Sequence, residues 1–426
     1  MNRLRTMGRR EWLVVLVGVG GLAAAIAIRA FLLPKAGLAG DDEGFLRWVR
    51  FVNRAGLPRA YDQPISFPAV MPWLWWLVGS VAPGILNQAE QDPTALALLK
   101  LPAALADLGI AAIVAWSLRA HPRWAVLAGV AILLVPATWY VSAWWGQFES
   151  LYVLPVLAAW LLVARGRFGW AAVALAIGLM AKPQALPLAV PFAAYYLRRT
   201  DLAGSLRAAL VGAATIVVLW APFLPWNGPA HYLKALETYT AGFNFLSLRA
   251  WNPWWMLQDS VGSGRLVADD VPIVGPVTLR WIGIAIAGLL ELAVFLLVWR
   301  RATPNGLAWG LAAASLGAFV GLTEMHERYA YAAVVFLLLA WPSRLAVATW
   351  VVVAMAVTLN LIAAVPPSGG PGALIPISGG LGTAGSLAMT FGLFATLWEL
   401  RRREPDTGGE PGTGGGATLS APIASG

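Results

Sequence analysis

The chain has 426 residues, of which 59% are hydrophobic and 12% are charged. Soluble proteins carry about 25% charged residues, so this composition excludes an ordinary soluble domain and indicates an integral membrane protein. The formal net charge of +9 does not indicate nucleic-acid binding, because most basic residues stand singly or in pairs beside apolar segments, as membrane orientation requires.

The N-terminal apolar run, residues 12–33, is longer than the apolar region of a signal peptide and long enough for one crossing. We therefore expect an uncleaved first span, with the arginines that precede it in the cytoplasm.

Later apolar segments also have the character of membrane spans, at residues 95–118, 124–143, 148–164, 203–224, 277–299, 305–322, 329–341, 345–364 and 380–399. Two shorter segments, 168–181 and 185–197, form a predicted hairpin around Lys182, Pro183 and Gln184. Together these segments predict an all-α polytopic membrane protein with about 12 transmembrane helices.

The apolar stretch 66–82 is ambiguous, because it is rich in tryptophan but interrupted by Pro68 and Pro72. If it does not cross, the arginine-bearing turns all fall on the cytoplasmic side, at residues 119–123, 165–167, 198–199, 300–301, 344 and 401–403. A crossing would invert all of these turns and violate the positive-inside rule repeatedly. We therefore expect 66–82 at the outer interface of the plasma membrane, with both termini cytoplasmic.

This topology predicts one transmembrane domain, residues 1–400, with outer loops at 34–94 and 225–276. In the first loop, apolar residues recur at helical spacing from Phe45 onward, opposite arginines, which predicts an amphipathic interfacial helix. The segment 401–426 is rich in Gly, Pro, Ser and Thr and is predicted to be a disordered cytoplasmic tail.

Asp41 and Asp42 follow the first span and open the predicted surface helix. Carboxylates at a helix N-terminus are stabilised by the helix dipole, so capping is one explanation for this pair. The other is catalysis, because a carboxylate at the mouth of an apolar cavity can accept a proton from an attacking hydroxyl group.

Polar residues also stand in two turns that fall on the outer side. An aromatic belt explains the turn 144–149, but Gln147 and Glu149 can also bond hydroxyl groups while Trp145 faces the apolar side of a sugar. Lys182 stands between two short segments, so its charge either snorkels to water or faces a cavity or an anionic partner.

The segment 324–329 ends a predicted span on the outer side. Its His326 imidazole and Arg328 guanidinium can grip a phosphate, and a salt-bridged helix end is the alternative. Asn252 belongs to an aromatic and amide cluster in the second outer loop, which generic interfacial tryptophans explain equally well.

Asp107 and Glu291 lie within predicted spans, where they serve either as polar contacts between helices or in a direct role. The chain has no cysteine and three widely separated histidines, which excludes thiol chemistry and argues against a histidine-rich metal site. Carboxylates remain able to hold a hard cation.

Five short motifs occur in a characteristic order: Asp41-x-Glu43 with Trp48, Leu99-Lys100-Leu101-Pro102 with Asp107, Trp145-Gly146-Gln147-Phe148, Lys182-Pro183-Gln184 and Met325-His326-Glu327-Arg328-Tyr329. In order, spacing and predicted side, they resemble the C-type (GT-C) glycosyltransferases, polytopic enzymes that use sugars linked to polyprenyl phosphate. The resemblance covers roughly residues 10–400 and is greatest to bacterial mannosyltransferase-like members and to glucosyltransferases that extend dolichol-linked oligosaccharide. The chain departs from the family in its first loop, where Ser66-Phe67-Pro68-Ala69 replaces the common Tyr-Pro-Pro step.

The resemblance implies an inverting enzyme that moves a hexose, with mannose the leading expectation, from a polyprenyl-phosphate donor to a lipid-linked or glycan acceptor outside the cell. It implies Asp41 as the catalytic base, with Asp42 as the second candidate, and no metal or cofactor. We expect His326, Arg328 and Lys182 to bind the donor phosphate. The expected substrate-binding residues are Glu43, Trp145, Gln147, Glu149, Gln184, Asn252 and Glu327.

Two other functions remain open from the sequence. A lipid or sugar transporter would need access from both sides and often shows internal repeats, which this chain lacks. A glycan ligase or assembly partner would move or help move a whole glycan block instead of one sugar.

Overall fold

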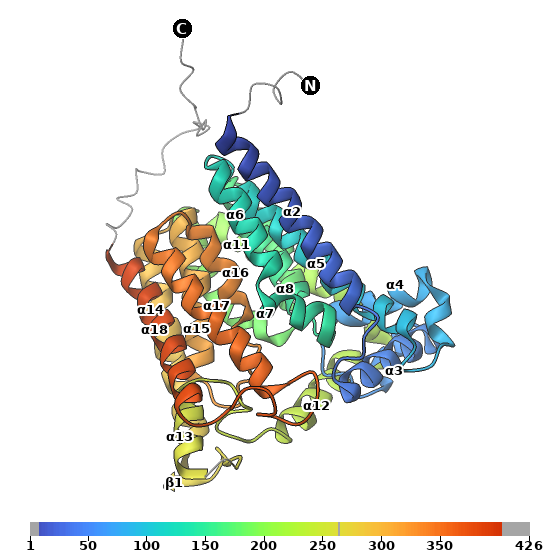
Figure 1. The fold of residues 1–426 in the computed structure, drawn as a ribbon. Coiled ribbons are helices and arrows are strands. Elements are labelled where there is room, and N and C mark those ends of the chain that lie inside the picture. The colour runs from blue at the N-terminus through green and yellow to red at the C-terminus, as the bar shows by residue number, and fades with distance from the viewer. Residues whose placement is uncertain (1–7, 263–264, 403–426) are drawn as a thin grey trace.

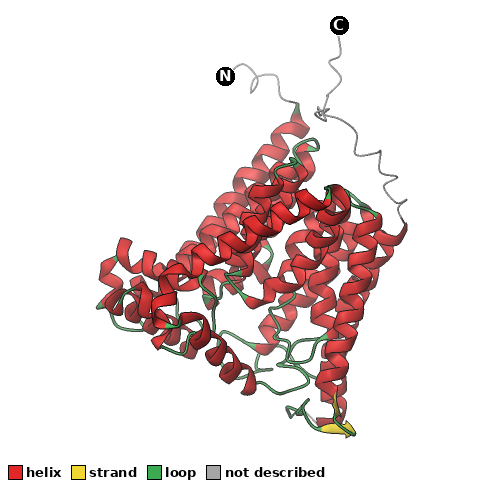
Figure 2. Cartoon of the chain, turned by 180° about the vertical axis from the view of Figure 1, so that it is seen from behind, coloured by secondary structure: helices red, strands yellow, loops and turns green. Residues whose placement is uncertain are grey.

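The computed structural model describes residues 8–262 and 265–402, and these form an assembly of helices (Figures 1 and 2). The α-helices are α2 (Arg9–Leu32), α3 (Ala39–Ala55), α4 (Val70–Val81), α5 (Pro93–Ser117), α6 (Pro122–Leu134), α7 (Pro136–Trp139), α8 (Glu149–Ala164), α9 (Phe168–Leu179), α10 (Ala189–Arg199), α11 (Leu202–Trp220), α12 (Gly228–Ala241), α13 (Pro253–Gly262), α14 (Leu279–Arg300), α15 (Pro304–Gly321), α16 (Tyr331–Phe336), α17 (Arg344–Ala364) and α18 (Gly380–Arg402).

Shorter elements join these helices. They are the 3₁₀ turns η1 (Leu57–Asp62), η2 (Pro83–Leu86), η4 (Pro183–Leu188), η5 (Ala221–Trp226) and η6 (Leu337–Ala340), the π-helical turn η3 (Tyr140–Trp145), and the antiparallel strands β1 (Pro272–Val274) and β2 (Val277–Thr278). The predicted all-α architecture is therefore confirmed, apart from this one short hairpin. Of the predicted tail 401–426, only residues 401–402 are described, and they end α18.

Six of the described helices are long and apolar enough to cross a membrane, or seven if the bent pair α6 and α7–η3 is one span. This indicates a multi-pass membrane protein. The number of these long apolar helices is lower than the predicted number of spans, because segments such as α8 and α9 form apolar helices of only 16 and 12 residues.

The ambiguous segment 66–82 forms α4, a helix of 12 residues. At 1.5 Å per residue it extends about 18 Å, well short of the roughly 30 Å of a hydrocarbon core. It packs on α3, the predicted amphipathic helix, and shares with it a small hydrophobic core that includes Phe45 and Trp75. Figure 1 shows both helices grouped beyond the end of α2.

The two ends of the assembly differ in charge. The guanidinium groups of Arg119 and Arg165 lie over the ring of Trp116, at 4.9 and 5.6 Å. The rings of Trp124 and Trp341 meet at 5.6 Å, so the turns that precede α6 and α17 lie at this same end. In Figure 1 the beginnings of α2 and α6 mark this basic end, and α3, α4, α12, α13 and β1 lie at the opposite one.

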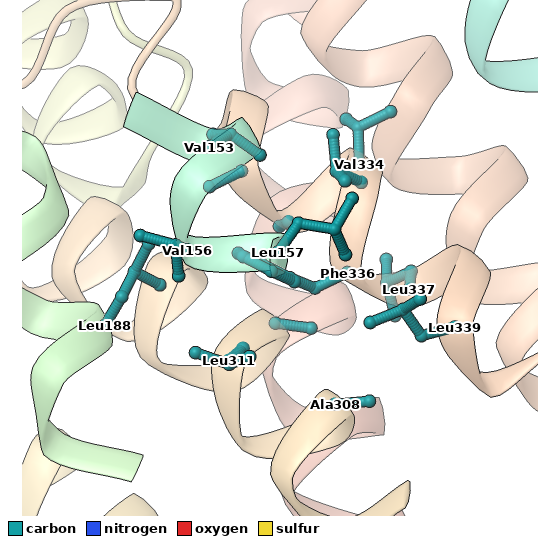
Figure 3. Packing of buried hydrophobic residues seen from close by; sticks show 14 of the residues in the cluster. Val153, Val156, Leu157, Leu188, Ala308, Leu311, Val334, Phe336, Leu337 and Leu339 are labelled. Atoms are coloured by element: carbon teal, nitrogen blue, oxygen red, sulfur yellow. The ribbon is translucent and has the colours of Figure 1, made fainter. Parts of the chain in front are cut away.

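The centre of the assembly is α15, in which every residue from 306 to 321 is buried. Its small residues allow neighbouring helices to approach closely: a Cβ added at Gly321 would lie 2.8 Å from the backbone of Ala287. Leu311 of α15 packs in one cluster with Leu157 of α8 and with Val334 and Phe336 of α16, as Figure 3 shows. This packed core fixes α8 and α16, whose ends reach the site described next.

Candidate active site

A cavity of about 640 Å³ lies at the end of the molecule opposite the basic turns. Its walls come from α3, the first outer loop, η4, α12, the beginning of α14 and the segment between α15 and α16. The polar residues that line it include Asp41, Arg47, Gln147, Lys182, Gln184, Arg280, Glu324, His326 and Arg328. Residues far apart in the sequence therefore meet in one cavity.

The first turn of α3 places Asp41 in this cavity. Its Oδ2 accepts hydrogen bonds from Trp145 Nε1 at 2.8 Å and Gln147 Nε2 at 2.7 Å. Both donors approach the same oxygen, and among the described residues no hydrogen bond reaches Oδ1. The carboxylate is thus held in one orientation while one oxygen stays available to accept a proton.

The local fold that delivers these donors is the π-helical turn η3. It ends at Gly146, which has a φ of 83°, a conformation that favours glycine. An added Cβ there would lie 3.0 Å from Lys100 and 3.3 Å from Asp42. Insertions of this type are frequent at functional sites, and here one turns Trp145 and Gln147 toward the same carboxylate.

Asp42 and Glu43 point elsewhere, because successive residues on a helix are rotated by about 100°. Asp42 is fully buried, accepts a hydrogen bond from Gly37 N at 2.7 Å, and lies 3.6 Å from Lys100 Nζ. Burial raises the pKa of Asp42 to about 6, although Lys100 opposes the shift. Glu43 Oε1 accepts from Gln91 Nε2 at 3.3 Å. Neither carboxylate lines the cavity.

Two cations form a second feature of the cavity wall. Lys182 Nζ donates to Glu149 Oε1 at 2.5 Å, and Arg328 Nε lies 3.3 Å from the same oxygen. Arg328 Nη1 also donates to Glu327 Oε1 at 2.7 Å. Lys182 and Arg328 line the cavity, whereas Glu149 and Glu327 lie behind them. The two carboxylates therefore hold the cations in place and leave their outer faces toward the cavity.

The surroundings shift the pKa values of several residues in and behind this wall. Burial would raise the pKa of Glu327, but Arg328 and His326 lower it to about 2, so this carboxylate is ionised. Burial, with Arg328, lowers the pKa of His326, which makes the imidazole neutral at pH 7. Burial also lowers the pKa of Lys182, while Glu149 opposes that shift. His326 can therefore donate one hydrogen bond, and the positive charge comes from Arg328 and Lys182.

A third charged group was not predicted from the sequence. Arg280 Nη2 pairs with Asp269 Oδ1 at 2.8 Å and with Glu324 Oε1 at 2.7 Å. Thr323 donates to the other oxygen of buried Asp269 at 2.5 Å. The one sequence signal for Arg280 was a lone arginine at the outer end of a predicted span. Glu324 has a φ of 60°, which is uncommon for a residue other than glycine and typical of strained functional segments.

The structure brings only part of the predicted set into the cavity. Asp41, Gln147, Lys182, Gln184, His326 and Arg328 line it, whereas Asp42, Glu43, Trp145, Glu149, Asn252 and Glu327 do not. Asn252 lies elsewhere: it is buried, donates to Phe319 O and accepts from Trp255 N, both at 2.9 Å. Asn252 directly precedes α13, and its side chain joins the first turn of that helix to α15.

The chain matches no family model and no curated protein. Within residues 8–262 and 265–402, no three His, Asp or Glu side chains gather in an arrangement that could hold a metal ion. The cavity wall combines one oriented carboxylate, Asp41, with two cations, Lys182 and Arg328.

Proposed function

We propose that the protein is an inverting GT-C-type glycosyltransferase, which moves a hexose from a polyprenyl-phosphate donor to a lipid-linked or glycan acceptor. The observation that carries this proposal is the arrangement around Trp145. Its indole N–H holds Asp41, and its ring lies 4.7 Å from the Arg328 guanidinium carbon. A proton acceptor at the edge of the indole and a cation over its face are thereby both held by one side chain.

The reaction is a single displacement. The acceptor hydroxyl oxygen attacks the anomeric carbon, and Asp41 Oδ1 takes the proton that this oxygen loses. The bond from the anomeric carbon to the phosphate oxygen breaks on the opposite face, and polyprenyl phosphate leaves with the electron pair. Arg328 and Lys182 stabilise the added phosphate charge, and His326 can donate a hydrogen bond to it. Attack from the opposite face inverts the configuration at the anomeric carbon.

The proposed topology has about 12 crossings, with both termini cytoplasmic and the cavity outside. The separation of charge supports it, because the basic turns and the cavity lie at opposite ends of the helices. The helix α4 is too short to cross, and its tryptophans are suited to an interface. A donor with a prenyl tail fits this arrangement, since the tail stays in the bilayer while the sugar reaches the outer loops.

The test is product analysis with purified protein, total lipid extract and a panel of radiolabelled prenyl-phosphate sugars that includes mannose, glucose and arabinose. We expect one sugar to be transferred by the wild type and none by Asp41→Asn. Transfer of a whole glycan block would favour a ligase. Counterflow of labelled substrate in proteoliposomes without a covalent product would favour a transporter.

A further inference from the structure

Two buried charges stand on α5, outside the cavity. Lys100 and Asp107 are both 0% exposed and are seven residues apart, so they share one face of the helix. Burying a charge is costly unless it is paired and hydrogen-bonded, and apolar side chains would pack these helices at a lower desolvation cost. Their presence therefore calls for a role that apolar packing does not provide.

Asp107 is the centre of a hydrogen-bond network between five elements. Its Oδ2 accepts two hydrogen bonds from Arg29 of α2, from Nε at 3.1 Å and from Nη2 at 2.8 Å. The same oxygen accepts a hydrogen bond from Ser142 Oγ of η3 at 2.6 Å. Oδ1 accepts from Ser150 Oγ of α8 and from Tyr331 Oη of α16, the latter at 3.3 Å. Ser150 and Tyr331 also contact each other at 3.0 Å.

Three of these partners are close in sequence to residues that line the cavity or hold its lining residues in place. Ser142 is three residues before Trp145 in the same turn, Ser150 follows Glu149 directly, and Tyr331 is three residues after Arg328. The elements that carry Trp145, which orients the proposed base, the shared carboxylate Glu149 and the cation Arg328 thus all have a residue bonded to, or close in sequence to one bonded to, Asp107.

Lys100 lies on the same face of α5, two turns before Asp107, and makes its own set of contacts. Its Nζ donates to Trp144 O and Lys35 O, both at 2.7 Å, and lies 3.6 Å from Asp42. Trp144 precedes Trp145, and Asp42 follows Asp41. Lys100 therefore fixes the end of α2, the start of α3 and the end of η3 relative to one another.

We propose that Asp107, together with Lys100, is a positioning residue: the buried charges of α5 set the relative orientation of the Asp41–Trp145 pair and the Lys182–Arg328 wall. Hydrogen bonds fix the direction of their donors, which apolar contacts do not. The effect on turnover rests on the proposed function, but the effect on the geometry of the wall does not, and the two are measured separately.

The geometric test uses the absence of cysteine from the chain. Gln147→Cys introduces a single thiol at a position that is 3% exposed, so a small methanethiosulfonate reagent should modify it slowly. Asp107→Asn in that background should raise the modification rate about fivefold or more, because the loosened turn opens to solvent more often. Glu291→Gln is the matched control, since Glu291 also lies within a candidate span and neither of its oxygens has a hydrogen-bond partner among the described residues.

The kinetic test compares the same variants without the cysteine. Asp107→Asn should lower kcat about tenfold or more while the acceptor KM stays unchanged, because misplacement of the reacting groups affects the transition state. Should Asp107→Asn fail to fold, Ser142→Ala with Ser150→Ala removes two donors and keeps the Arg29 pair. Equal thiol rates and equal kcat values in the Asp107 and Glu291 variants would overturn the proposal. A raised thiol rate with no transferase activity in the wild type would instead leave the positioning intact and remove the proposed function.

Discussion

Trp145 donates a hydrogen bond of 2.8 Å to Asp41 and, with the face of the same indole, contacts the guanidinium of Arg328. One side chain therefore aligns the proposed base with a proposed phosphate ligand. In the proposed reaction, Asp41 accepts the proton of the attacking hydroxyl group and Arg328 stabilises the departing phosphate.

Trp145→Phe keeps an aromatic face for Arg328 but removes the N–H that orients Asp41. Hydrogen bonds to charged groups contribute about 1.5–3 kcal/mol, so we expect kcat to fall about ten- to a hundredfold. The matched control is Trp144→Phe, because no hydrogen bond from the Trp144 indole is found among the described residues. Saturation kinetics for both variants are the measurement, and equal losses would contradict an orienting role for Trp145.

Asp41→Asn and Asp42→Asn should have opposite consequences. Loss of a general base costs about 10²- to 10⁴-fold in rate, and we expect this from Asp41→Asn with an unchanged Tm. Asp42→Asn leaves buried Lys100 without its carboxylate, so Tm should fall while turnover persists. Thermal unfolding and transfer assays on both variants decide the matter, since full inactivation by Asp42→Asn at unchanged Tm would make Asp42 the base.

Arg328→Lys preserves the positive charge but not the planar group that lies over Trp145 and pairs with Glu327. Because lysine cannot reproduce stacking or a forked contact with phosphate, kcat/KM for the donor should fall about tenfold or more. Arg59→Lys is a suitable control, as Arg59 lies over the ring of Trp226 outside the cavity. An undiminished kcat/KM in Arg328→Lys would mean that charge alone is used at this position.

Much of the fold followed from hydropathy, because each predicted span became one or more helices. The number of full crossings stays a prediction, since helices such as α8 and α9 match their apolar segments but, at 16 and 12 residues, are shorter than the roughly 20 residues of a full crossing. Within the site, sequence proximity grouped Asp41, Asp42 and Glu43, but helical rotation sends them to three environments. The pairing of Arg280 with Asp269 and Glu324 could not be predicted either, because it depends on how the second outer loop packs against the segment after α15.

Glu324 should make the stability of the protein depend on pH. Burial raises the pKa of Glu324 from its ordinary 4.5 to about 7; Arg280 opposes this shift, while Asp269 and Asp270 add to it. Because the folded state holds this proton more tightly than the unfolded state, the associated stability is complete below pH 4.5 and is lost as pH rises through about 7. Glu324→Gln should flatten the decline of Tm over this range. The control is Glu237→Gln at an exposed carboxylate of α12, and a decline that persists in Glu324→Gln would exclude Glu324 as its source.

Thiol labelling can test the sidedness on which the proposed chemistry depends. Ser80 of α4 and Arg119 of the α5–α6 turn are both exposed, at opposite ends of the helices, and the native chain contributes no thiol. A membrane-impermeant maleimide added to intact cells should label Ser80→Cys and should label Arg119→Cys only after permeabilisation. Gln184→Cys, which lines the cavity, should follow Ser80→Cys. Labelling of Gln184→Cys from the cytoplasmic side would place the cavity inside the cell, where an acceptor outside the membrane could not reach Asp41.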